Sequence, residues 1–299
     1  MFGFMFKQTN NILVWIKLLA GLLLLFLLQG TLPGPASSSG FYLVYLPMVR
    51  IDRSAYYVST IGDDSNPGTY ELPWKTIAHA ASIVVMGDLV YIRGGIYVEA
   101  VKIYQNGTQQ LPIQFFAFPG EVPIIDGENN LPGAGGGLIS ISGDWVEISG
   151  IEIRSSNYYG IGLYGKHNSV NNVFVHHSYR TGVLINGDYG VVKNSRIWRN
   201  SIINEYGISS IWSSGVVAAR DIADGITSLA VIRGNIVTEN WGQGISTYEA
   251  DRTIIEDNII SDSYVTNVYI HDATNITCQR NLIYTDPNSY AYPSGAHRG

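Results

Sequence analysis

Two acidic residues, Glu249 and Asp272, stand 23 positions apart in a chain that repeats with a period of 22 or 23 residues. Equal positions in stacked strands lie about 4.8 Å apart, so the two carboxylates are expected to be neighbours. A sheltered pair would share a proton or hold a cation such as calcium, whereas an exposed pair needs neither. A separation of about 5 Å is also the one that retaining glycoside hydrolases use. The pair therefore indicates acid–base or cation chemistry if it is sheltered from water.

Other side chains are expected on the same outward strand face, and the two carboxylates stand in the turns where these strands end. His271 could act as a base or a ligand, although a lone outward histidine is often only a strand residue. Tyrosine rings on a strand face stack well against sugar rings, but tyrosine is also common in strands. The candidate catalytic residues are Glu249, His271 and Asp272. The candidate substrate-binding residues are Tyr164, Lys166, Asn186, Asp188, Trp212, Tyr248 and Tyr269.

The repeat that places these residues is defined by the apolar residue that opens each unit. These openers are spaced by 22, 22, 40, 23 and 23 residues, and they are Ile148, Val170, Val192, Ile232, Ile255 and Cys278. The long step predicts one ordinary unit with about eighteen inserted residues between positions 202 and 228, which include Trp212 and Arg220. Long loops on a solenoid commonly overhang its binding face, so this insertion is expected to form a groove wall.

Each unit holds three short apolar-alternating segments separated by glycine or asparagine, and none has helical spacing. Such a unit cannot bury its apolar side alone, but stacked units can. We therefore predict an all-β parallel β-helix, a solenoid of about eight or nine coils. Asn235, Asn258 and Asn281 are expected to stack in one turn with left-handed backbone, and Cys278 is expected to be a buried core residue.

The stack needs a cover at its first coil, where apolar core and strand edges would otherwise be exposed. Residues 74–85 have helical spacing, with Trp74, Ile77 and Ala81 on one side and Pro73 at the start. The pattern predicts a short N-terminal capping helix.

Three motifs in this opening part resemble those of a known family. They are Tyr56-Tyr-Val-Ser-Thr-x-Gly-Asp-Asp-Ser-Asn-Pro-Gly68, Pro73-Trp-Lys-Thr-Ile-Ala-His-Ala80 and Gly87-Asp-x-Val-Tyr-Ile-Arg-Gly-Gly-x-Tyr97. They are similar to the opening of secreted right-handed parallel β-helix proteins, including the family-nine pectate lyases. The resemblance implies a lysine or arginine base, with calcium held by clustered aspartates.

The chain departs from that lyase pattern in its repeats. They contain no Asp-Asp-x-x-Asp cluster, and the nearest basic candidate is Lys166. Lys166 is expected at least about 14 Å from Glu249 if the inserted unit stays in the stack. The identity of any metal is therefore left open by the sequence.

The first 36 residues are interpreted as a signal peptide. Lys7 and Lys17 precede an apolar run over residues 18–28, and small residues near Ala36 suit cleavage. An uncleaved membrane anchor is the alternative. Residues 37–54 are expected to be a linker and N-terminal arm, and residues 55–299 the β-helix domain. The chain stops at Gly299 with no evident cap, which predicts a C-terminal truncation or a covering partner.

Composition narrows the range of partners. The formal charge is −6, and charged residues make up only 14% of the chain, which argues against nucleic acid. A membrane contact is expected only through the N-terminal segment. We predict a secreted or extracytoplasmic cell-surface protein that binds polysaccharide, lyase-like or a glycoside hydrolase if it is an enzyme. The alternative is a noncatalytic adhesive module.

Overall fold

The computed structural model describes residues 55–286 except residues 134, 206–212, 221–224 and 226. The predicted signal peptide or anchor, the arm, Trp212 and the C-terminal end lie outside the described residues. Among the described residues, no helix has both the length and the apolar character needed to cross a membrane.

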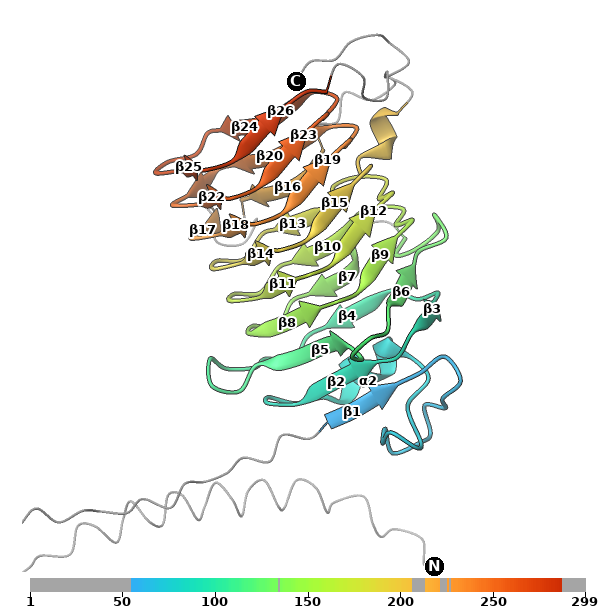
Figure 1. Cartoon of the computed structure of the whole chain (residues 1–299). Coiled ribbons are helices and arrows are strands. Elements are labelled where there is room, and N and C mark those ends of the chain that lie inside the picture. Colours follow the sequence, from blue (N-terminus) through green and yellow to red (C-terminus); the bar gives the residue numbers. More distant parts are fainter. Residues whose placement is uncertain (1–54, 134, 206–212, 221–224, 226, 287–299) are drawn as a thin grey trace, which may run out of the picture. The chain divides into compact units, whose positions relative to one another are not determined.

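Nearly all strands belong to three parallel sheets that run along one stack of coils (Figure 1). The first sheet contains β1 (Ala55–Val58), β2 (Leu89–Ile92), β5 (Ile113–Ala117), β8 (Val146–Ser149), β11 (Ser169–Asn171), β14 (Val191–Lys193), β18 (Val231–Arg233), β22 (Ile254–Glu256) and β25 (Thr277–Gln279). The second sheet contains β3 (Gly95–Tyr97), β6 (Pro123–Asp126), β9 (Glu152–Arg154), β12 (Phe174–His176), β15 (Arg196–Trp198), β19 (Ile236–Thr238), β23 (Ile259–Ser261) and β26 (Leu282–Tyr284). The third sheet contains β4 (Val101–Ile103), β7 (Gly137–Ile141), β10 (Tyr159–Leu163), β13 (Val183–Ile185), β16 (Ser214–Ala219), β20 (Gln243–Tyr248) and β24 (Thr266–His271). A fourth, two-stranded sheet pairs β17 (Thr227–Ser228) with β21 (Ala250–Asp251), and a 3-10 helix, η2, spans Ile202–Asn204.

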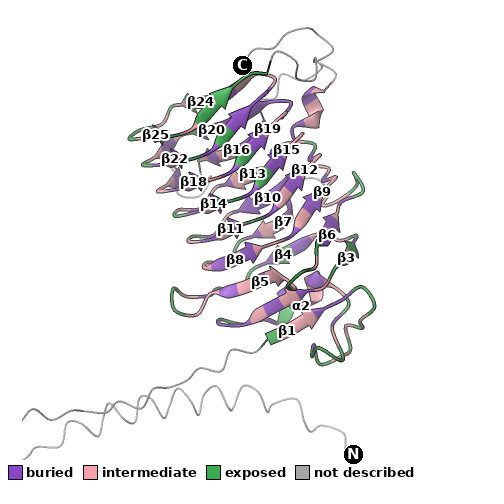
Figure 2. Cartoon of the chain, in the orientation of Figure 1, coloured by how far each residue is buried: buried purple, intermediate pink, exposed green. Residues whose placement is uncertain are grey.

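Each coil contributes one strand to each sheet, so seven coils are complete within the described residues, with β1 before them and β25 and β26 after them. The repeat register of the sequence is the pairing register, because Ile148 pairs with Val170 and Ile255 with Cys278. In the three-residue strands of the first and second sheets from β9 to β23, the central residue is buried, whereas in β4 and β13 of the third sheet the two flanking residues are buried. Buried segments run along the stack (Figure 2). The predicted parallel β-helix is therefore confirmed.

The capping helix is present but shorter than predicted. Helix α2 spans Ile77–Ile83 and buries Ile77, Ala80 and Ala81 against the first coils. It begins late because Thr76 is the N-cap, whose hydroxyl accepts a hydrogen bond from the His79 amide. Trp74, expected in the first helical turn, instead makes an isolated bridge to Val58.

The asparagine stack is confirmed, but the predicted backbone conformation was wrong. Asn235 and Asn258 are buried, and each donates its side-chain amide to the side-chain oxygen of the next asparagine at 2.9–3.0 Å. The left-handed residues are those immediately before the asparagines: Gly234, Asp257 and Arg280. The preceding residue makes the sharp turn, and the asparagine amide then satisfies backbone groups inside it.

Cys278 has the predicted register but not the predicted burial. Its side chain is exposed, and Ile270 and Ile283 are each 46% exposed. These residues belong to the last described coils, and no further coil among the described residues covers them. A side chain that points into the solenoid is therefore buried only where the next coil of the stack covers it.

The inserted unit stays in the stack, as predicted. Strand β16 lies between β13 and β20 in the third sheet, paired in parallel with both. The additional residues fall in two places, between β15 and β16 and between β16 and β18. The second of these segments provides Arg220, directly after β16.

Candidate functional site

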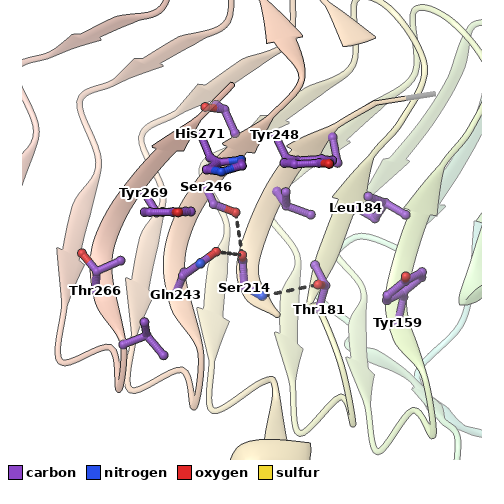
Figure 3. A pocket seen from close by; sticks show the side chains of 14 residues that line it. Tyr159, Thr181, Leu184, Ser214, Gln243, Ser246, Tyr248, Thr266, Tyr269 and His271 are labelled. Carbon is purple, nitrogen blue, oxygen red and sulfur yellow. Dashed lines mark hydrogen bonds between the residues drawn. The ribbon is translucent and has the colours of Figure 1, made fainter. Parts of the chain in front are cut away.

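A groove of about 800 Å³ runs over the outer face of the third sheet, from β10 to β24 (Figure 3). Strand pairing aligns its residues in three rows across five successive coils. The first row is Tyr159, Thr181, Ser214, Gln243 and Thr266. The second row contributes Leu184, Val217, Ser246 and Tyr269, and the third contributes Ala219, Tyr248 and His271. The floor is half-buried aliphatic surface in the middle coils, where Leu184, Val217 and Ala219 lie.

One end of the groove is aromatic. The ring of His271 stacks on that of Tyr248, with centroids 5.3 Å apart and an interplanar angle of 13°. It also stacks on the ring of Tyr269 at 5.6 Å and 18°. Tyr248 and Tyr269 are 43% and 41% exposed, so this aromatic platform presents surface to solvent. The sequence prediction that these three residues lie together is borne out by their geometry, whereas their role stays a prediction.

A hydroxyl–amide network lies beside the platform. The Ser214 hydroxyl donates to the Gln243 side-chain oxygen at 2.9 Å, and it lies 2.6 Å from the Ser246 hydroxyl. A serine hydroxyl has one proton, so the Ser246 hydroxyl must be the donor in the second bond. The network therefore fixes three neutral polar groups next to the aliphatic floor (Figure 3).

The two predicted carboxylates lie on the left-handed turns after β20 and β24, but each has its own cationic or ionisable neighbour. Glu249 accepts a hydrogen bond from Arg220 Nη1 at 3.0 Å. Asp272 Oδ2 lies 3.3 Å from His271 Nδ1, and its side chain is 68% exposed. The structure therefore fits the exposed alternative, and not a sheltered pair of carboxylates that shares a proton. A hydrogen bond to the Glu249 carboxylate raises the pKa of the Tyr248 phenol, because the bond favours the protonated phenol.

Tyr164, Lys166, Asn186 and Asp188, which were predicted to bind substrate, do not line the groove. Lys166 Nζ forms an ion pair with Asp188 Oδ2 at 3.3 Å, and Asn186 donates its side-chain amide to the Ala219 carbonyl at 3.0 Å. The Tyr164 ring folds over Gly162, where a Cβ atom would lie 2.5 Å from the ring. Burial raises the pKa of Tyr164 to about 12. Asn186 and the Lys166–Asp188 pair therefore support the third-sheet turn, while Trp212 lies outside the described residues.

Sequence reasoning missed the first row and the contribution of β16. The sequence does contain a signal for the first row, since its members stand directly before the recurrent glycines. Tyr159, Thr181 and Gln243 precede Gly160, Gly182 and Gly244. Ser214 precedes Gly215 in the same way, but the flanking insertions hid this alignment.

The described residues do not supply the calcium site that the pectate lyase resemblance implies. They contain no group of three or more His, Cys, Asp or Glu side chains placed to hold a metal ion. The Glu249 and Asp272 carboxylates face different partners, so they do not form a cation cage. The groove residues therefore do not fit an aspartate-held calcium ion, and no chemical step here depends on one.

Comparisons with known proteins place the chain among polysaccharide lyase-like β-helices. A family model described as "Pel9A-like, right handed beta helix region" matches residues 56–280. Pectate lyase L of Paenibacillus polymyxa is 30% identical over 156 residues, which are 50% of this chain and 34% of that protein. The uncharacterised protein YwoF of Bacillus subtilis is 41% identical over 73 residues, 24% of this chain and 16% of that protein. This chain therefore spans well under half of either relative.

Solved structures agree on the fold. Pectate lyase Pel9A superposes with a TM-score of 0.61 at 22% identity, over 70% of this chain and 54% of that one. A rhamnogalacturonan lyase superposes with a TM-score of 0.59 at 18% identity, over 78% of this chain and 67% of that one. Because the family model covers most of the coils, the chain belongs to the Pel9A-like right-handed β-helix family.

Proposed function

We propose that this protein binds a polysaccharide in the groove over the third sheet. The observation that carries the proposal is the exposed aromatic platform of Tyr248, His271 and Tyr269 at one end of that groove. Aromatic faces stack on sugar rings with little loss of side-chain entropy. Pectate lyases among the relatives act on a polysaccharide by name, which supports the same ligand class here.

Affinity electrophoresis against soluble plant and bacterial polysaccharides tests this proposal. Retardation of the protein by at least one polysaccharide is expected, and the replacement Tyr248→Ala should reduce it. Tyr104→Ala is the matched control, because Tyr104 is 65% exposed but does not line the groove. A protein that migrates unretarded through every polysaccharide gel would contradict the proposal.

A second candidate function is turnover of the bound chain, as a lyase or glycoside hydrolase. It is favoured by the Asp272 carboxylate beside His271 Nδ1, because a carboxylate in that position orients an imidazole for proton transfer. Glu249, beside Tyr248 and Arg220, is the other candidate acid–base group. The competing interpretation is a noncatalytic adhesive module that binds without cleavage.

Assays for reducing ends and for unsaturated products distinguish these functions. Turnover should fall by about 100-fold or more in His271→Ala, Asp272→Asn and Glu249→Gln if the three groups transfer protons. Unchanged rates in all three variants would move the chemistry elsewhere. Binding without any product would support the adhesive module.

The proposed ligand class also implies a location outside the cytoplasm. We place the protein in the secreted or cell-surface fraction, in agreement with the signal-like residues 1–36. Fractionation of the producing cells with an antibody against residues 55–286 tests this placement. A protein found only in the cytoplasmic fraction would overturn it.

A further inference from the structure

The charged side chains at the turn edge of the groove are paired within the protein, whereas Arg180, beside the first-row residue Thr181, lies over the Tyr158 ring at 4.7 Å. Arg220, at the edge beyond β16, donates to Glu249 at 3.0 Å. Lys166 lies 3.3 Å from Asp188, two coils along the same edge from Arg220. Asp272 extends past His271 at the aromatic end, with 68% of its side chain exposed. Among the described residues that line the groove itself, none is a lysine, an arginine or a carboxylate.

The floor of the groove and the hydroxyl–amide network beside it are built from neutral groups. The floor in its middle coils is the aliphatic surface of Leu184, Val217 and Ala219. The polar groups beside it are the hydroxyls and amide of Ser214, Ser246 and Gln243, which exchange hydrogen bonds with one another. Hydroxyl and amide groups match the hydroxyls of a sugar, whereas a uronate carboxylate requires a cationic partner to offset its lost hydration.

By composition, the residues between 202 and 228 are more acidic than basic. Between residues 202 and 228 the sequence contains one basic residue, Arg220, against three acids, Glu205, Asp221 and Asp224. The chain as a whole has a formal charge of −6. At the turn edge a polyanion would therefore meet paired cations and the exposed Asp272 carboxylate, and the one cation beside the first row in the described residues is Arg180.

We infer that the groove takes a neutral glycan segment, and that polyuronates such as polygalacturonate are not its ligands. This inference rests on the proposed function, because it specifies the class of polysaccharide that the same groove binds. The faces of some sugar rings lie against the platform of Tyr248, His271 and Tyr269. The neighbouring sugar units of the same glycan cross the aliphatic floor over β13 and β16. The Ser214–Gln243–Ser246 network supplies hydrogen bonds to their hydroxyls.

Affinity electrophoresis tests the inference with two sets of probes. The neutral set is galactan, arabinan, xylan and mixed-linkage glucan, and the anionic set is polygalacturonate and alginate, each run in calcium chloride and again in EDTA. Retention by at least one neutral glycan and by neither anionic one is the expected result. Tyr269→Ala should weaken that retention about tenfold, while Tyr104→Ala should not change it. Tyr248→Ala provides the same test if circular dichroism shows that Tyr269→Ala does not fold.

The possible results separate this inference from the function on which it rests. Retention by polygalacturonate or alginate that Tyr269→Ala removes would overturn the neutral ligand and leave polysaccharide binding in the groove intact. Retention by a neutral glycan that neither tyrosine variant weakens would overturn both, because the ligand would lie elsewhere. Failure to bind any probe would also overturn both.

A charge introduced into the floor gives an independent test. Val217 is half-buried and lines the groove, so Val217→Lys places an ammonium group among the neutral residues. We expect this variant to gain retention by polygalacturonate and to lose affinity for the neutral glycan. Unchanged behaviour toward both probes would overturn the placement of the glycan on this floor.

Discussion

At the scale of single residues, two adjacent histidines show how burial sets a protonation state outside the groove. His176 Nδ1 and His177 Nδ1 lie 2.7 Å apart, and His176 Nε2 lies 3.3 Å from Glu152 Oε1. In that contact only one of the two Nδ1 atoms can carry a proton. If His176 donates from Nε2 to Glu152, its Nδ1 accepts the proton of His177 Nδ1, which gives two neutral rings. Desolvation by burial lowers the pKa of both imidazoles, more than Glu152 raises that of His176.

The lowered pKa values predict a loss of stability in mild acid. A histidine with a lowered folded-state pKa stabilises the fold fully above its unfolded pKa of about 6.5, and this contribution falls as the pH drops toward the folded value. The double variant His176→Asn/His177→Asn should therefore show a smaller fall in melting temperature below about pH 6.5 than the wild type. Asparagine tolerates the left-handed backbone at position 177, where φ is 55°.

Thermal melts of both proteins across the pH range measure this difference. Above about pH 7.5, where both rings are neutral, the gap between the two melting temperatures should be constant, which provides the internal control. Parallel curves from pH 8 to pH 5 would show that these histidines contribute nothing to acid sensitivity.

The candidate site shows what residue types alone could and could not predict. The repeat register placed Tyr248, Tyr269 and His271 on one face, because equal positions in successive coils become neighbours. It could not find the partners of the carboxylates. Arg220 follows β16 and takes the same register position as Glu249 one coil earlier, but the insertions on both sides of β16 hide this alignment in the sequence.

At the scale of secondary-structure elements, the buried asparagine stack holds the turn between the first and second sheets. Asn258 donates to the Ile232 carbonyl at 2.9 Å, and its side-chain oxygen accepts from the Asn235 backbone amide at 2.9 Å. One amide side chain thus satisfies backbone groups of the preceding coil. Turns without such a partner would leave buried polar groups unpaired.

Asn258→Ala should therefore destabilise the fold strongly. The replacement leaves the buried Asn235 amide without its acceptor and removes one of the bonds to the Ile232 carbonyl, which still pairs with β22. An unsatisfied buried group costs about 1–3 kcal/mol and a lost hydrogen bond about 1 kcal/mol, so we expect a loss of about 3 kcal/mol. Asn130→Ala is the matched control, because Asn130 is exposed and should change stability by less than about 0.5 kcal/mol. Urea unfolding followed by circular dichroism measures both, and equal midpoints for the two variants would contradict the expected role of the stack.

The elements also show why the coils could be predicted better than the end pieces. Inward residues such as Val175 and Ile197 recur in every unit, so the pattern is averaged over many coils. Helix α2 occurs once, and its start depends on Thr76 as a cap and on the bridge of Trp74 to Val58. The exposure of Cys278 depends on whether another coil covers its strand, which no local pattern reports.

At the scale of the whole molecule, net charge predicts how ligand binding responds to salt. The formal charge of −6 belongs to a chain whose groove, in the part that the structure describes, is lined by no lysine, arginine or carboxylate. Binding of a neutral glycan releases no counterions and encounters no net field, so its affinity should change by less than about twofold as the Debye length falls from about 30 Å at ~0.01 M salt to about 3 Å at ~1 M. Titration calorimetry over that range measures the affinity.

Val217→Lys with polygalacturonate is the positive control, since attraction between opposite charges must weaken as salt rises. A wild-type affinity that rises steeply with salt would mean that an anionic ligand is being repelled, and a steep fall would mean that a cationic surface outside the groove residues binds it.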